Sequence, residues 1–169
     1  MLSGVIILIM GKADSAVSLF KKGLNCAQSL LLVYGTELGM DNETALRIAT
    51  AFGSGMGKMG ETCGAVTGAF MIIGLRHGTA HSKDRRSKSR TYELVERFVE
   101  KFKARNNTIV CRELVGADMG TPGVGRIIMQ KCPKYVHDSA ELIEEILEIQ
   151  AGETVSGQEQ LHVPVKGHK

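Results

Sequence analysis

Hydrophobic residues recur every three or four positions along most of the chain, which is the spacing of one buried face of an α-helix. No stretch alternates apolar and polar residues for long enough to predict a β-strand. We therefore expect an all-α fold, a single-domain helical bundle of about five main helices with short helical turns. The expected helices span residues 13–22, 26–38, 44–52, 61–77, 84–105, 111–115 and 133–149.

Two of the expected helices carry distinctive faces. The helix over 84–105 is long and amphipathic, and the residues expected on its buried face are Tyr92, Val95, Phe98, Val99 and Phe102. The helix over 61–77 carries small residues at four-residue spacing, namely Gly64, Ala65, Gly68 and Ala69. Small residues so spaced let another helix approach closely. The partner is either a helix of the same chain or a second subunit in a homodimer.

Glycine and proline shape the expected connections. Four glycines in residues 53–60, GSGMGKMG, predict a loop. Nucleotide binding is disfavoured there, because the run follows a helix rather than a strand and lacks the GKS or GKT of a phosphate loop. The loop makes either a tight turn or a close backbone approach to Cys63. Residues 116–131 are expected to be a glycine-bearing connection, with Pro133 opening the last helix.

Composition limits the classes of function. The chain has 169 residues, 43% of them hydrophobic, and can form one core without disulfides. Its net charge is only +3, aromatic residues make up 5% and Trp is absent, so nucleic acid is not an expected partner. The basic run over residues 81–90 is expected to be the solvated start of a helix.

The two ends of the chain differ from its middle. Residues 1–12 are expected to form an apolar extension that is too short to insert into a membrane and that lacks the features of an export signal. A cytoplasmic location follows from this expectation. A four-cysteine redox domain is expected over residues 13–150, followed by a mobile polar tail over residues 151–169.

The four cysteines, Cys26, Cys63, Cys111 and Cys132, all lie at or beside an expected helix start. The N-terminus of a helix carries partial positive charge and free N–H groups, which stabilise a thiolate. Thiols stay reduced in the cytoplasm, so a cysteine there is interpreted first as a metal ligand or a catalytic group and only second as half of a disulfide. We therefore expect these cysteines to form one working site.

The chemistry of that site stays open at this level. Four cysteines are the usual ligands both of iron–sulfur clusters and of structural zinc. The gaps of 37, 48 and 21 residues between them lack the CxxC pair of compact metal sites. Cys63 is alternatively the reactive thiolate of a thiol–disulfide oxidoreductase or redox sensor. For any one of these cysteines taken alone, a small apolar side chain packed in the core explains its presence as well as a functional role does.

Four blocks of the sequence resemble the family of redox-active proteins named after its CGCAxxGCC motif. The blocks are GLNCAQSLL, GSGMGKMGETCGAVTGA with its CGAxxG core, CRELVG, and KCPKYVHDSAELIEEIL. The resemblance covers about residues 14–149 and implies a helical domain with a redox role for its four cysteines. The chain is also similar to the non-haem part of split-Soret cytochromes, which implies an iron–sulfur cluster bound by four thiolates. The chain has no CxxCH, so covalent haem is not implied.

The main expectation is a redox-active electron carrier with an iron–sulfur cluster of the [2Fe–2S] type. Its ligands are expected to be Cys26, Cys63, Cys111 and Cys132, with Gly60 and Gly64 beside the cofactor. The redox partner is unknown from sequence. A thiol–disulfide enzyme with a reactive Cys63 is the first alternative, and a structural zinc or interaction protein is the second.

Overall fold

The computed structural model describes residues 11–151, which form helices joined by short connections. The elements are α2 (Lys12–Lys21), α3 (Cys26–Leu30), the π-helical segment η1 (Leu31–Gly35), α4 (Asn42–Thr50), α5 (Gly53–Met56), α6 (Gly64–His77), α7 (Arg85–Asn106), α8 (Cys111–Val115) and α9 (Val124–Ala151). Within these residues the only β-type pairing is an isolated antiparallel bridge between Thr62 and Val110. The predicted all-α, single-domain fold is confirmed.

Two expected segments fall outside the described residues. The apolar extension is described only at residues 11–12, and the polar tail only at residue 151, where α9 ends. Between residues 11 and 151, no helix combines the length and apolar character that a membrane span requires.

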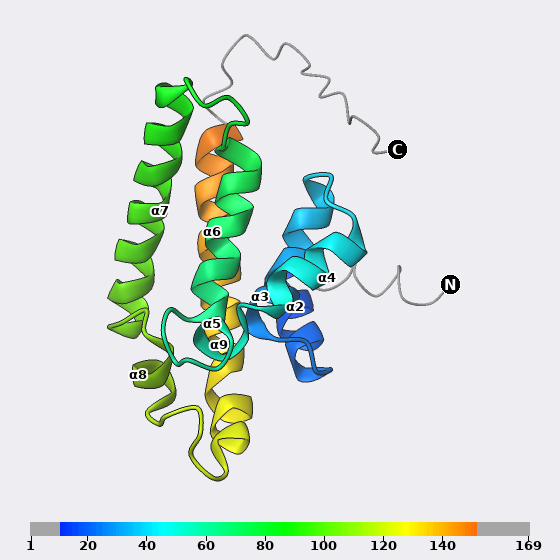
Figure 1. Cartoon of the computed structure of the whole chain (residues 1–169), viewed down its shortest axis with the longest axis vertical. Coiled ribbons are helices and arrows are strands. Elements are labelled where there is room, and N and C mark those ends of the chain that lie inside the picture. Colours follow the sequence, from blue (N-terminus) through cyan, green and yellow to red (C-terminus); the bar gives the residue numbers. More distant parts are fainter. Residues whose placement is uncertain (1–10, 152–169) are drawn as a thin grey trace, which may run out of the picture.

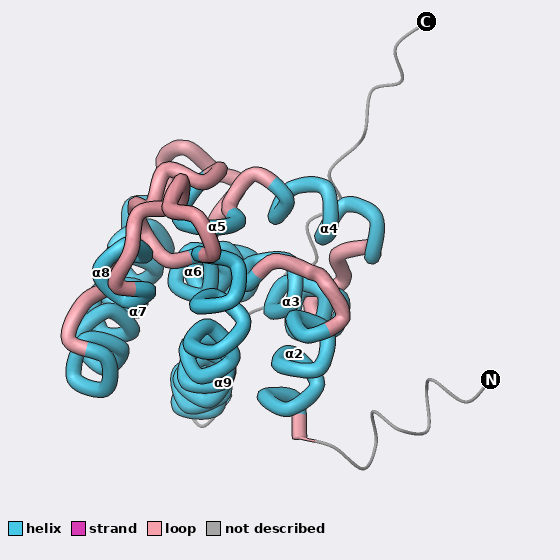
Figure 2. The backbone as a smooth tube through the Cα atoms, turned by 90° about the horizontal axis from the view of Figure 1, so that it is seen from below, coloured by secondary structure: helices cyan, strands magenta, loops and turns pink. Residues whose placement is uncertain are grey.

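Helix α9 is the central element of the bundle. Helices α6, α7 and α9 run side by side along the long axis, while α2, α3 and α4 lie on one flank (Figure 1). Viewed end-on, α9 lies between α7 on one side and α2 on the other (Figure 2). The core therefore forms around α9, which packs against α2, α6, α7 and α8.

Local capping signals account for where several helices begin. Asn25, Asp41 and Asp84 each accept a hydrogen bond, 2.9–3.0 Å long, from the backbone N–H three residues further on. Such caps satisfy N–H groups that the first turn of a helix leaves unpaired. The starts of α3, α4 and α7 were accordingly predictable to within about two residues.

The buried stripe of α7 differs from the predicted one. Leu94, Phe98 and Phe102 are buried, and their four-residue spacing places them on one face. Val95 and Val99 are half-buried beside them. Tyr92, which was expected to be buried, is 65% exposed, because a position two residues before Leu94 lies on nearly the opposite side of the helix.

The start of the last helix was also predicted wrongly. Helix α9 begins at Val124, so Pro133 lies inside it and residues 124–131 are helical rather than a glycine-bearing connection. An internal proline costs a helix about 3 kcal/mol because it removes a hydrogen bond and crowds the preceding turn. Tertiary contacts offset this cost on both sides: Lys131 donates to the carbonyl of Val115 at 2.8 Å, and Tyr135 donates to that of Leu114 at 2.9 Å.

The glycine face of α6 packs against α3 of the same chain. A Cβ atom built on Gly68 would lie 3.1 Å from the Cα of Ala27, and one built on Gly64 would lie 2.9 Å from the carbonyl oxygen of Phe52. The close helix approach predicted from the spacing of small residues is confirmed, and its partner is internal.

This contact is testable with two alanine substitutions in α6. Gly74→Ala is expected to stabilise the fold by up to about 1 kcal/mol, because alanine favours a helix and a Cβ there meets open space. Gly68→Ala gains the same propensity but crowds the backbone of Ala27, so it should be less stable than Gly74→Ala by about 1–3 kcal/mol. Urea unfolding of both variants measures the difference. Equal stabilisation would contradict the close packing of α3 on α6.

Candidate functional site

The structure brings the four cysteines together around one cavity. Each is buried, with 7%, 2%, 5% and 4% of its surface exposed in chain order, and each is a free thiol. The cavity has a volume of about 210 Å³. Its other lining residues are Phe20, Gly23, Leu24, Asn25, Ser54, Gly64, Ile128 and Met129. Four sulfur atoms from four separate elements thus border one space.

Cys26 is held by the capping box at the start of α3. Asn25 accepts from the N–H of Gln28 at 2.9 Å, and the Gln28 side chain accepts from the N–H of Asn25 at 3.0 Å. The Asn25 amide also donates to the carbonyls of Ala49 at 3.1 Å and Thr50 at 3.2 Å, which joins α3 to the end of α4. Cys26, as the first helical residue, takes its position from this doubly anchored cap.

Cys63 and Cys111 are brought to one face of a short antiparallel pairing around the Thr62–Val110 bridge, diagonally across it. The N–H of Cys63 donates to the carbonyl of Ile109 at 2.8 Å, and the N–H of Cys111 donates to that of Glu61 at 2.6 Å. Cys63 caps α6 and Cys111 begins α8, as the sequence predicted. The pairing itself was missed, since two short stretches 48 residues apart carry no strand pattern.

Cys132 departs from its expected position. It lies inside α9, immediately before Pro133, and not at a helix start. Because proline has no N–H, the carbonyl of Met129 four residues earlier lacks its usual helical donor. The dipole of a helix N-terminus therefore acts on three of the four cysteines. The pKa of Cys132 depends on the side chains around it instead.

A left-handed loop closes one side of the site. All five residues from 54 to 58 have positive φ angles, between 52° and 69°. Gly55 is the most confined of them, since a Cβ there would lie 2.6 Å from the Cβ of Cys111 and 2.8 Å from the N of Glu61. Arg112 holds the end of the loop: it donates to the carbonyls of Gly60 at 3.2 Å and Met59 at 2.8 Å and pairs with Glu61.

The two glycines expected beside a cofactor have different positions. Gly64 lines the cavity. Gly60 is buried but is not among the lining residues, and its carbonyl instead accepts from the N–H and Nε of Arg112. The apolar lining residues Phe20, Leu24 and Met129 were missed, because in sequence they have the pattern of ordinary core positions.

Burial dominates the protonation of the thiols. It raises the pKa of Cys63 to about 12, although the N–H groups of Ala65 and Val66 act in the opposite direction. Burial likewise raises the pKa of Cys111 to about 11. Both residues are therefore neutral thiols at pH 7, which disfavours Cys63 as a free attacking thiolate.

Cys26 and Cys132 form an interacting pair. The interaction between their side chains raises the pKa of Cys26 and lowers the pKa of Cys132. The cation of the adjacent Lys131 acts on Cys132 in the same direction. In the metal-free state, Cys132 thus has more thiolate character than the other three cysteines.

The confinement of Gly55 predicts how alanine substitutions in the loop behave. Gly55→Ala and Gly57→Ala both place alanine at a positive φ, which costs about 1–2 kcal/mol each. Only Gly55→Ala also forces a Cβ against Cys111, so it should lose about 2 kcal/mol more in urea unfolding and speed labelling of Cys111 by a thiol reagent. Equal losses in the two variants would contradict this loop geometry.

The comparisons with known proteins point to the same set of cysteines. The chain matches a family model described as "Putative redox-active protein (C_GCAxxG_C_C)" over residues 24–146, a range that contains all four cysteines. Neither the curated proteins nor the solved structures give a match. Since the model covers most of the chain, this protein belongs to the C_GCAxxG_C_C family of redox-active proteins.

Proposed function

We propose that the chain is an electron-transfer protein whose four cysteines bind one iron–sulfur cluster of the two-iron type. The observation that carries this proposal is the cavity of about 210 Å³ bordered by Cys26, Cys63, Cys111 and Cys132. A cluster bound by four cysteine thiolates needs four convergent sulfur atoms and space between them for iron and sulfide.

The size of the cavity favours a cluster over a single zinc ion. Four thiolates about 2.3 Å from one zinc ion close tightly around it. The cavity is instead far larger than the ~30 Å³ that one water molecule takes up in the liquid. A cavity of this size has room for the iron and sulfide ions of a cluster, which a single zinc ion does not need.

The charge balance supports metal binding of some kind. Among the described residues no Lys or Arg side chain lines the cavity, so four buried thiolates would have no cation beside them. Buried charges without a partner are costly, and the raised pKa values of Cys63 and Cys111 reflect that cost. Bound iron supplies the compensating positive charge, and the N–H groups at the start of α6 can stabilise the sulfur of Cys63.

A thiol–disulfide function is the second candidate, and the interaction of Cys26 and Cys132 in the lining of one cavity favours it. In that reaction the Cys132 thiolate attacks a substrate disulfide and forms a mixed disulfide. Cys26 then attacks Cys132, which forms the internal disulfide and releases the second substrate thiol. The acting pair is then Cys26 and Cys132, and Cys63→Ser should keep the reversible two-electron couple that Cys132→Ser loses.

Anaerobic purification tests the cluster directly. The protein is expected to be coloured and to contain about two iron and two sulfide ions per chain. Cys63→Ser and Cys111→Ser should lose most of both, because each removes a thiolate ligand. Ser54→Ala is the matched control, since Ser54 lines the same cavity without offering a thiolate. A colourless, iron-free protein with one zinc ion per chain would contradict the proposal.

Metal binding should also depend steeply on pH. The raised pKa values keep Cys26, Cys63 and Cys111 protonated at neutral pH, so binding of a metal must displace these protons. Binding therefore weakens as pH falls. With Zn²⁺ as the probe on metal-free protein, calorimetry in buffers of different ionisation enthalpy should show at least about three protons released per ion between pH 6 and pH 8. Release of one proton or none would contradict a site made of these cysteines.

A further inference from the structure

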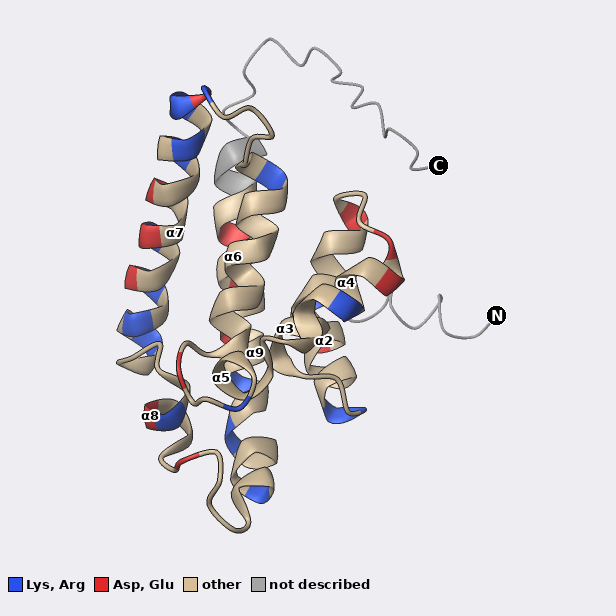
Figure 3. Ribbon diagram, viewed as in Figure 1, with Lys and Arg blue, Asp and Glu red and all other residues tan. Residues whose placement is uncertain are grey.

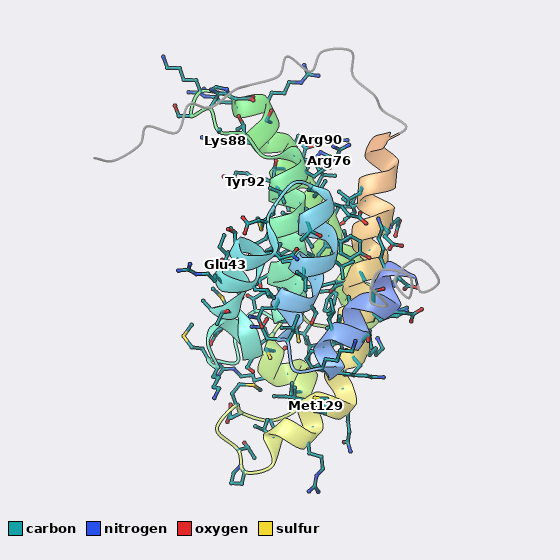
Figure 4. All side chains as sticks on the ribbon, turned by 90° about the vertical axis from the view of Figure 1, so that its right-hand side faces the viewer. Glu43, Arg76, Lys88, Arg90, Tyr92 and Met129 are labelled. Carbon is teal, nitrogen blue, oxygen red and sulfur yellow. The ribbon has the colours of Figure 1, made fainter. Side chains whose placement is uncertain are left out.

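The cavity reaches the surface between the end of α2 and the first turns of α9. Gly23, just after α2, is exposed and lines the cavity. Met129 lines it from α9 and has 48% of its surface exposed. Met129 lies at the end of the molecule opposite Lys88 and Arg90 (Figure 4). We call this opening, bordered by Gly23 and Met129, the mouth.

Three of the chain segments that line the cavity carry basic residues and no acidic ones, whereas the segments of Cys63 and Cys111 also carry Glu61 and Glu113. Residues 15–36, 44–60 and 119–136 all contribute lining residues and contain no Asp or Glu. Their charged residues are Lys21, Lys22, Arg47, Lys58, Arg126, Lys131 and Lys134. Basic residues mark the lower end of α2 and the first turns of α9, while α7 carries residues of both signs and acidic residues lie near α4 (Figure 3).

The cations nearest the mouth in sequence have no charged or hydrogen-bonding side-chain partner among the described residues. Lys21 and Lys22 lie between Phe20 and Gly23, which both line the cavity, and Arg126 lies two residues before Ile128. All three cations are exposed, and their side chains make no ion pair or hydrogen bond with any residue between 11 and 151. Their charge is therefore available to a molecule outside the chain.

We propose that the mouth is the docking surface for an acidic redox protein, a small electron carrier whose own redox centre is surrounded by Asp and Glu. The inference rests on the proposed function, since it names the partner class of the same redox centre. In the transfer, the reduced carrier loses one electron and the cluster bound by the four cysteines gains it. The mouth joins the cavity that the four cysteines line to the surface.

The position of the charges favours a protein over a small anion. No Lys or Arg described in the structure lines the cavity, so an anion that entered it would meet thiols and apolar side chains instead of a cation. Leu24, Ile128 and Met129 provide an apolar centre, and the cations lie around it on separate elements. An apolar centre with a charged rim is the usual arrangement of a docking surface between proteins.

Charge reversal at the mouth tests the inference with a matched control at the far end of the molecule. K21E/K22E and R85E/R86E change the net charge equally, and Arg85 and Arg86 are exposed at the start of α7. The probe is reduced plant-type ferredoxin, an acidic protein with a low reduction potential. At low salt, K21E/K22E should slow reduction of the cluster by ferredoxin about tenfold, and R85E/R86E by less than about twofold.

Salt and a probe of opposite charge provide two further readouts. The difference between the two variants should disappear at about 0.5 M salt, where the Debye length falls to a few ångströms. Oxidation of the reduced protein by cytochrome c, a basic acceptor, should not be slowed by K21E/K22E. Equal slowing by both variants would overturn the docking site. Competition by millimolar inorganic phosphate at constant ionic strength would also overturn it, in favour of a small-anion site.

Equilibrium binding of fluorescently labelled ferredoxin separates this inference from the proposed function, because binding needs no electron transfer. If the protein contains no iron and only K21E/K22E weakens its binding of ferredoxin, the proposed cluster is contradicted and the proposed docking surface is supported. If the protein contains the cluster but K21E/K22E changes neither its binding of ferredoxin nor its reduction rate, only the proposed docking surface is contradicted.

Discussion

The contact between α3 and the glycine face of α6 is the constraint on which the rest of the site depends. Gly64 and Gly68 let the backbone of α3 come within contact distance of α6, with Ala27 against the glycines. Cys26 precedes Ala27 and Cys63 precedes Gly64, so one close contact places two cysteines beside each other from elements 37 residues apart. A larger side chain at either glycine would separate the two sulfur atoms as well as the two helices.

Much of the fold was predictable because its signals are local. The caps at Asn25, Asp41 and Asp84 are hydrogen bonds between a side chain and the backbone three residues away, which sequence spacing encodes directly. The features that were missed depend on distant residues. Pro133 lies inside a helix because α8 accepts hydrogen bonds from Lys131 and Tyr135, and no local pattern near Pro133 indicates those partners.

The grouping of the four cysteines at the candidate site was predictable from the sequence, but their electrostatics were not. The four cysteines were evident as a group, and three of them do lie at helix starts. From those positions alone, lowered pKa values were expected. Burial reverses the expectation at Cys63 and Cys111, because the free energy lost when a thiolate leaves water exceeds the gain from a few backbone N–H groups. Burial depends on which distant elements cover a residue, which local sequence does not state.

The same burial explains why the charges of this protein are arranged as they are. A redox centre that needs a dry, apolar surrounding cannot keep lysines in its first layer, since each would itself need a buried partner. A cation at the mouth remains in water and keeps its charge without such a cost. Its field still acts over about 8–10 Å at moderate salt, which is enough to orient an approaching partner. In the proposed docking surface, apolar lining at Leu24 and Met129 insulates the centre, and exposed cations at Lys21, Lys22 and Arg126 attract the partner. Two requirements that would conflict at a single position are thus met by different residues.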